Sequence, residues 1–169
     1  YYLIDYKDPV ALFGSVLYLE GLSITVGNPK IMVFYVALLP TIERFVRERL
    51  VPAENHVEEH DEVPDHLVRD MKEMGLFGLS IPEEFGGIGL SMSQEVQVAY
   101  EIGRTSLAFR SVFGTNIGIG SQGILMDGTP EQKSDYLPRI ASGELIISFA
   151  LTEPDAGSDA ASLKTRGVK

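Results

Sequence analysis

The sequence lacks cysteine, and its basic residues are few: 14 lysines and arginines stand against 24 aspartates and glutamates. Without cysteine the chain can form no disulfide, no thiolate metal site and no cysteine nucleophile. The net charge of −10 argues against nucleic acid or an anionic membrane surface as a partner. An apolar fraction of 44% still allows a packed core, and 169 residues give room for one domain or one and a half.

Charge is especially scarce at the front of the chain, where only Glu20 and Lys30 are charged between residues 9 and 42. A membrane-spanning helix needs about 20 mostly apolar residues. Residues 9–29 supply that length only with Glu20 inside, where a carboxylate costs about 2.5–3.5 kcal/mol. No basic n-region or obvious cleavage site marks a secretory signal. We expect one or two apolar helices that do not pack into the acidic remainder, with membrane contact through residues 9–42 left open.

Within this front part, the stretch LSITVGNPKIMVFYVALLPT at 22–41 is similar to a segment of the lysine-exporter family of amino-acid transporters. The resemblance implies that Asn28-Pro29 marks a break in a membrane helix. An unrelated apolar helical hairpin is the alternative. We interpret residues 1–42 as a transporter-like remnant joined near 41–43 to a different protein.

From residue 43 onward the pattern predicts a mainly α-helical domain that extends to residue 142. Several helix boundaries are signalled by caps and helix-terminating residues. They are Pro64 at the first position of a helix with Gly75 just past its end, Ser91 with Gln94, and Thr129 with Pro130 and Gln132. Pro138 is expected to cut the last of these helices short.

Two motifs in this domain are better explained by structure than by chemistry. His56 and His60 share a helix face, but they lie in an acidic stretch without an H-E-x-x-H pattern, so we expect a solvated surface and no metal site. Gly118–Gly123 fits G-x-G-x-x-G, yet no alternating strand precedes it and Gly128-Thr-Pro follows too soon for a crossover helix. We expect its small residues to allow close helix packing.

Residues 145–152 change to the period of a β-strand. Its two faces carry Leu145, Ile147, Phe149 and Leu151 on one side, and Ile146, Ser148, Ala150 and Thr152 on the other. The second face is small enough for a large flat ring to lie on it. The turn 153–159 follows, in which Pro154 breaks the strand and Gly157 permits a positive φ. Such a turn is either an ordinary Pro/Gly turn or a phosphate site made of backbone amides.

The octapeptide Thr-Glu-Pro-Asp-Ala-Gly-Ser-Asp at 152–159 resembles the flavin-binding signature of the acyl-CoA dehydrogenases. PEEFGGIGL at 82–90 and GTPEQKSDYLP at 128–138 resemble further segments of that family, so the match covers most of 44–169. The resemblance implies a mainly α fold: a helical N-terminal domain over 43–142, followed by the first strand of a flavin-binding β-domain at 143–169.

The resemblance also implies a cofactor, FAD, and residues that bind it: Phe149, Leu151, Thr152, Gly157 and Ser158, with Ser158 near the acyl-CoA substrate as well. In this family a glutamate removes the α-proton of an acyl-CoA thioester while the β-hydride passes to the flavin. That glutamate belongs to a later helical domain, so we assign no catalytic residue here and do not give the role to Glu153 or Asp155.

The chain begins without methionine and stops soon after the signature, so we expect an enzyme fragment that is cut at both ends and inactive alone. Implied partners of the parent enzyme are acyl-CoA, an electron-transfer flavoprotein and a second copy in a homo-oligomer; nucleic acid is not expected. The expected location is the cytoplasm. Two alternatives stay open: a membrane-associated exporter remnant, and a non-catalytic helical interaction module.

Overall fold

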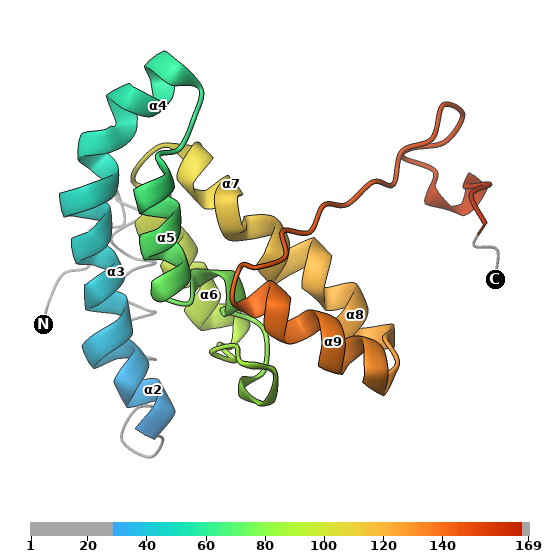
Figure 1. Cartoon of the computed structure of the whole chain (residues 1–169), viewed down its shortest axis with the longest axis horizontal. Coiled ribbons are helices and arrows are strands. Elements are labelled where there is room, and N and C mark those ends of the chain that lie inside the picture. The colour runs from blue at the N-terminus through green and yellow to red at the C-terminus, as the bar shows by residue number, and fades with distance from the viewer. Residues whose placement is uncertain (1–28, 167–169) are drawn as a thin grey trace, which may run out of the picture. The chain divides into compact units, whose positions relative to one another are not determined.

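The computed structural model describes residues 29–166, and this part of the chain is helical without a β-strand (Figure 1). The α-helices are α2 (Pro29–Val33), α3 (Leu39–Phe45), α4 (Glu54–His60), α5 (Asp65–Glu73), α6 (Met92–Ile102), α7 (Leu107–Thr115), α8 (Ser121–Asp127) and α9 (Pro130–Ala141). Shorter π or 3₁₀ segments are η1 (Phe34–Leu38), η2 (Val46–Leu50), η3 (Val51–Ala53), η4 (Leu76–Gly78), η5 (Glu83–Phe85), η6 (Asn116–Gly120) and η7 (Ala160–Ser162). The predicted mainly α fold is confirmed.

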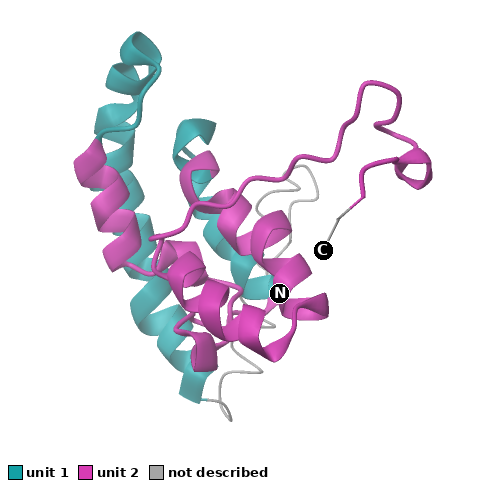
Figure 2. Cartoon of the chain, turned by 45° about the vertical axis from the view of Figure 1, so that its right-hand side comes forward, with its two compact units in different colours: residues 1–64, 92–110 teal, residues 65–91, 111–169 magenta. Residues whose placement is uncertain are grey.

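The chain divides into two compact units (Figure 2). In the described part, unit 1 consists of residues 29–64 and Met92–Arg110, and unit 2 consists of Asp65–Ser91 and residues 111–166. Each unit is therefore built from two separate stretches of sequence, and each has its own buried side chains.

Unit 1 is organised by an uninterrupted helical run from α2 to α4, which packs on α6. Phe34 and Ile42 of this run are 2% and 0% exposed. The Tyr35 hydroxyl accepts a hydrogen bond from Gln97 Nε2 of α6 at 2.7 Å. The expectation that the apolar front part does not pack into the acidic remainder is therefore wrong for residues 29–42. Apolar side chains recur at helical spacing on both sides of residue 43, so the helix and its packing continue through this position. Residues 9–28 lie outside the described part.

Among residues 29–166, no helix is both long and apolar enough to cross a bilayer. The division of the chain at residues 42 and 142 stays a prediction.

Unit 2 contains the glycine-rich loop 76–90, which folds back on itself. The Ile88 amide donates to the Gly78 carbonyl at 2.9 Å, and the Leu90 amide donates to the Leu79 carbonyl at 2.7 Å. Gly87 lies so close to the loop's other arm that an added Cβ would stand 1.9 Å from the Ile81 carbonyl oxygen. Leu79 and Ile81 are almost fully buried, so this loop is part of the core.

The predicted helix boundaries of unit 2 hold, with two corrections. The helix predicted to begin at Pro64 is α5, which begins one residue later, at Asp65. Gly75, just past the end of α5, has φ +74°, and α9 begins with a complete capping box of Thr129 and Gln132. Pro138, however, does not end α9, which continues to Ala141. A proline inside a helix removes one intrahelical hydrogen bond, and burial of Leu137, Ile140 and Ala141 on this helix offsets that loss.

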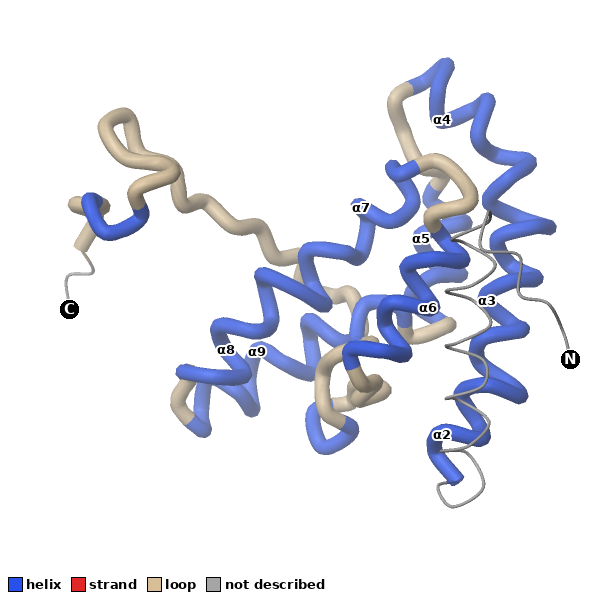
Figure 3. The backbone as a smooth tube through the Cα atoms, turned by 180° about the vertical axis from the view of Figure 1, so that it is seen from behind, coloured by secondary structure: helices blue, strands red, loops and turns tan. Residues whose placement is uncertain are grey.

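Residues 145–152 do not form the predicted strand (Figure 3). Their chain is extended, but a strand exists only when it is paired, and no other segment within 29–166 lies beside it as a partner. In the turn that follows, Glu153 and Ala156 form an isolated antiparallel bridge. The prediction of a strand is therefore wrong for the described structure, although the extended conformation is present.

Candidate functional site

The side chain of Asn116 fixes the start of the extended segment. Asn116 is 0% exposed, and its Nδ2 donates to the carbonyls of Ile140 at 3.1 Å and Leu145 at 2.8 Å. Its Oδ1 accepts from the Ile147 amide at 3.0 Å. The side-chain amide of Asn116 thus forms hydrogen bonds both to α9, at Ile140, and to the start of the extended segment, at Leu145 and Ile147. Sequence analysis missed it, because a single asparagine in a helix carries no local signal of such a role.

Of the three glycines of the G-x-G-x-x-G motif, Gly120 allows close packing as predicted, whereas a Cβ added at Gly118 or Gly123 would meet no atom within 4 Å. The three glycines belong to η6 and α8, so the motif lacks the strand that a dinucleotide site requires. An added Cβ at Gly120 would stand 2.5 Å from Ile147 Cγ2. The small residue therefore lets the extended segment approach the helix closely. Leu145 and Ile147 pack there against the buried cluster of Ile81, Leu137, Ile140 and Ala141.

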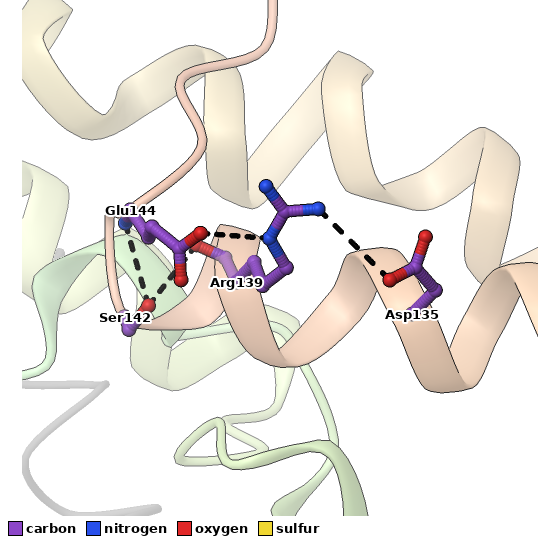
Figure 4. A network of polar contacts seen from close by, with 4 residues as sticks. All are labelled: Asp135, Arg139, Ser142 and Glu144. Carbon is purple, nitrogen blue, oxygen red and sulfur yellow. Dashed lines mark hydrogen bonds and ion pairs between the residues drawn. The ribbon is translucent and has the colours of Figure 1, made fainter.

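Polar side chains at the end of α9 hold the backbone just before this segment (Figure 4). Arg139 Nε donates to Glu144 at 2.8 Å, and its Nη1 lies 3.9 Å from Asp135 Oδ1. Ser142 Oγ accepts from the Glu144 amide at 3.3 Å. These groups are solvent-exposed, so each pair contributes little to stability. Their effect is to define the course of residues 142–144.

Beyond Ile147 the predicted flavin residues are open to solvent. Phe149 is 56% exposed and Leu151 is 37% exposed, while the side chains of Thr152 and Ser158 are exposed as well. The alternation predicted for residues 145–152 is thus visible at Leu145 and Ile147 only. The structure brings Thr152 and Gly157 together: a Cβ added at Gly157 would meet Thr152 Cγ2 at 3.4 Å. Gly157 does not have the positive φ that the sequence allowed.

The turn 153–159 is closed by its first residue, Glu153. Its backbone pairs with that of Ala156, with the Glu153 amide donating to the Ala156 carbonyl at 2.7 Å. Its carboxylate accepts from the amides of Lys164 at 2.9 Å and Thr165 at 2.7 Å, and from the Thr165 hydroxyl. The Lys164 ammonium also pairs with Asp155 at 3.3 Å. Residues 164–165 are thereby tied to the turn.

These hydrogen bonds define the protonation behaviour of Glu153. The Thr165 hydroxyl, followed by the Lys164 and Thr165 amides, lowers the pKa of the Glu153 carboxyl below its ordinary value. A carboxylate that already accepts three hydrogen bonds, with a lowered pKa, is a poor general base near neutral pH.

The lowered pKa of Glu153 predicts how the turn responds to acid. A depressed folded-state pKa stabilises the closed turn fully above the ordinary glutamate value of about 4.3, and this contribution is lost as pH falls through the lower folded-state pKa. In an NMR titration the Lys164 and Thr165 amide shifts should therefore stay constant at neutral pH and move together only below about pH 4.3. In Glu153→Gln, which cannot titrate, both shifts should stop following pH. A midpoint above the ordinary value would contradict the geometry of the turn.

Comparison with known proteins gives one family for most of the chain. The family described as "Acyl-CoA dehydrogenase, N-terminal domain" matches residues 36–144. The very long-chain specific acyl-CoA dehydrogenase of Macaca fascicularis is 42% identical over 135 residues, which are 80% of this chain and 20% of that protein. The (2S)-methylsuccinyl-CoA dehydrogenase of Cereibacter sphaeroides is 45% identical over 127 residues, or 75% of this chain and 23% of that protein.

A solved structure agrees with these relatives. The acyl-CoA dehydrogenase of Bacillus anthracis, crystallised with FAD, superposes with a TM-score of 0.63 at 37% identity, covering 75% of this chain and 22% of that one. The chain thus spans about a quarter or less of the length of these proteins. The transporter resemblance of 22–41 gains no support, since the family match begins inside that segment, at residue 36.

Proposed function

This chain belongs to the acyl-CoA dehydrogenase family, and on that premise we propose that it supplies the helical domain and flavin-binding turn of an oxidoreductase that desaturates an acyl-CoA thioester. The observation that carries the proposal is the order of parts along the chain. The family match over 36–144 leads, through the Asn116-anchored link, directly into the turn that bears the signature at 152–159. Because the chain covers a fraction of its relatives, the activity belongs to the larger assembly of domains.

The turn fits a phosphate-bearing cofactor such as FAD. Within residues 29–166 the amides of Gly157 and Ser158 have no hydrogen-bond partner, although the turn around them is closed. Consecutive free amides in a turn form an anion site, and the exposed Ser158 hydroxyl adds a donor beside them. Bound FAD would supply the electron acceptor for oxidation of the acyl chain.

The chain's own residues would bind and orient that cofactor. We propose that Phe149 and Leu151 pack against the flavin ring and that the Thr152 hydroxyl donates to its polar edge. Ser158 would lie near the phosphates and the acyl-CoA. Thr152 and Gly157 are neighbours in the turn, so the ring edge and the phosphate end of one ligand could be held by a single closed loop. The Glu153 hydrogen bonds keep that loop in place before a ligand arrives.

Proton abstraction is assigned to no residue of this chain. Glu153 is occupied by its donors, and Asp155 is exposed and paired with Lys164. We therefore propose that the base is contributed by another domain and that the 169 residues alone do not oxidise acyl-CoA. An electron-transfer flavoprotein as electron acceptor, a homo-oligomeric parent enzyme and a cytoplasmic location remain part of this proposal. The acyl group stays open, because relatives of similar identity are named for different substrates.

A chimera with the Bacillus anthracis enzyme tests the proposal. Residues 36–166 would replace the matching part of that enzyme, which is known to bind FAD. The chimera is expected to purify yellow and to reduce its flavin when acyl-CoA is added. Thr152→Val in the chimera should weaken FAD binding or shift the flavin spectrum, since it removes one hydroxyl and keeps the β-branched shape.

The matched control is Thr41→Val, which removes a hydroxyl that bonds only to the Ala37 carbonyl of its own helix, at 2.7 Å. It should leave colour and turnover unchanged. The unmodified 169-residue chain, titrated with FAD, should show no stoichiometric binding, because a tight site surrounds most of its ligand. A chimera that folds but stays colourless would overturn the proposal that this part of the chain helps to bind FAD. Bleaching of the flavin by acyl-CoA in the presence of the 169-residue chain alone would overturn the claim that the chain is inactive by itself.

A further inference from the structure

Contrary to the expectation from the sequence that His56 and His60 form no metal site, we propose that these two residues of α4 form a two-histidine chelate for a divalent transition metal such as Zn²⁺ or Ni²⁺. The two residues are four apart on α4 (Glu54–His60), so both side chains leave the same face of the helix. Their rings stack with centroids 4.2 Å apart and planes inclined by 18°. The site lies in unit 1 and is independent of the proposed flavin turn.

The structure shows which ring nitrogen of His60 is free. His60 Nδ1 lies 3.0 Å from the His56 carbonyl oxygen. A carbonyl can only accept, so Nδ1 carries the proton and Nε2 of the neutral ring keeps its lone pair. Metal-binding histidines commonly donate their second ring N–H to a backbone carbonyl in this way, which fixes both tautomer and orientation. The hydrogen bond therefore prepares His60 Nε2 as a ligand.

Ring spacing and exposure allow both histidines to reach one ion. Two nitrogens bound to a tetrahedral zinc at about 2.0–2.1 Å each lie roughly 3.3 Å apart. In the stack the two ring planes are nearly parallel, so the in-plane lone pairs do not yet converge on one point. The exposed His56 ring therefore has to turn out of the stack to share an ion with His60, which keeps its hydrogen bond to the His56 carbonyl. Within residues 29–166 no group of three or more potential ligands gathers, so water would complete the coordination sphere.

The surrounding charges favour a cation. Between Arg49 and Arg69 there is no lysine or arginine, whereas six carboxylates occur: Glu54, Glu58, Glu59, Asp61, Glu62 and Asp65. Such a local excess of negative charge raises the concentration of cations near the helix. Imidazole ligands then select zinc, nickel or copper over magnesium or calcium, which prefer oxygen.

Isothermal titration of the tag-free chain with Zn²⁺, and separately with Ni²⁺, tests the site. We expect one ion per chain, with His56→Gln and His60→Gln each weakening binding by about tenfold or more. The chain has three histidines, so His66→Gln is the matched control and should bind like the parent. Circular dichroism checks that each variant keeps its helix content.

Three results would overturn the proposal. One is the absence of saturable binding up to about 1 mM metal, which corresponds to a negligible affinity. The second is equal weakening in all three histidine variants, which indicates diffuse binding. The third is unchanged binding in His56→Gln and His60→Gln together with a loss in Glu59→Gln, which would assign the ion to carboxylates.

Discussion

The Gly87→Ala variant is expected to lose about 3 kcal/mol or more of unfolding free energy, an amount typical of severe overpacking. The added Cβ would stand 1.9 Å from the Ile81 carbonyl oxygen and 2.7 Å from the Gly78 carbonyl oxygen. Both contacts are with backbone, so no side-chain rotation relieves them. The loop must open, which breaks the hydrogen bonds of the Ile88 and Leu90 amides. Urea unfolding followed by circular dichroism measures the loss.

Gly123→Ala is the control for this prediction. Gly123 lies inside α8, and an added Cβ would have no atom within 4 Å. Alanine in a helix interior is favoured over glycine by about 1 kcal/mol, so this variant should match or exceed the parent in stability. A Gly87→Ala chain that unfolds at the parent's urea midpoint would show that the loop is not packed as described.

Replacing Asn116 by leucine is expected to destabilise the fold by about 3 kcal/mol, because it leaves several buried polar groups without partners. Leucine keeps the number and branching of the side-chain heavy atoms while it removes every hydrogen-bonding group. The carbonyl of Leu145 and the amide of Ile147 lose their Asn116 partner together. Beyond stability, the variant should release the extended segment, so the amide of Ile147 should exchange rapidly with deuterium.

Asn55→Leu provides the same chemical change at an exposed position of α4. Surface substitutions away from special features usually alter stability by no more than about 0.5 kcal/mol, so this control should unfold like the parent. If Asn116→Leu also unfolds like the parent, and Ile147 stays protected from exchange, the link between α9 and the extended segment depends on packing against Gly120 and not on the amide.

The helical part of the fold could be predicted because its signals are local. Thr129 with Gln132 forms the capping box that its spacing predicts, and α6 begins directly after Ser91. The change of composition at residue 43 falls inside a continuous helical run, so composition does not mark a helix end there. Charge and hydropathy indicate which side chains contact water, but they do not show where a helix ends. Here the helical run continues while its exposed face changes from apolar to charged side chains.

The candidate site could be predicted from the sequence only where the interacting residues are close together in the chain. The bridge between Glu153 and Ala156 is local, and the break at Pro154 was expected. The strand at 145–152 was not realised, because pairing depends on a second segment that no periodicity reveals. Asn116 contacts carbonyls 24 and 29 residues away. Contacts at that separation depend on tertiary folding and leave no pattern in the neighbouring sequence.

The exposed segment 145–152 has a consequence for solubility. It is a run of eight uncharged residues, rich in β-forming side chains and without proline, which is the composition of an aggregation-prone segment. Carboxylates flank it on both sides, Glu144 before and Glu153 after. Stacking of identical chains in register would bring like charges together at both ends of the run, as gatekeeper residues do in natural strands. The same glutamate that closes the turn therefore also opposes fibril formation by its neighbour.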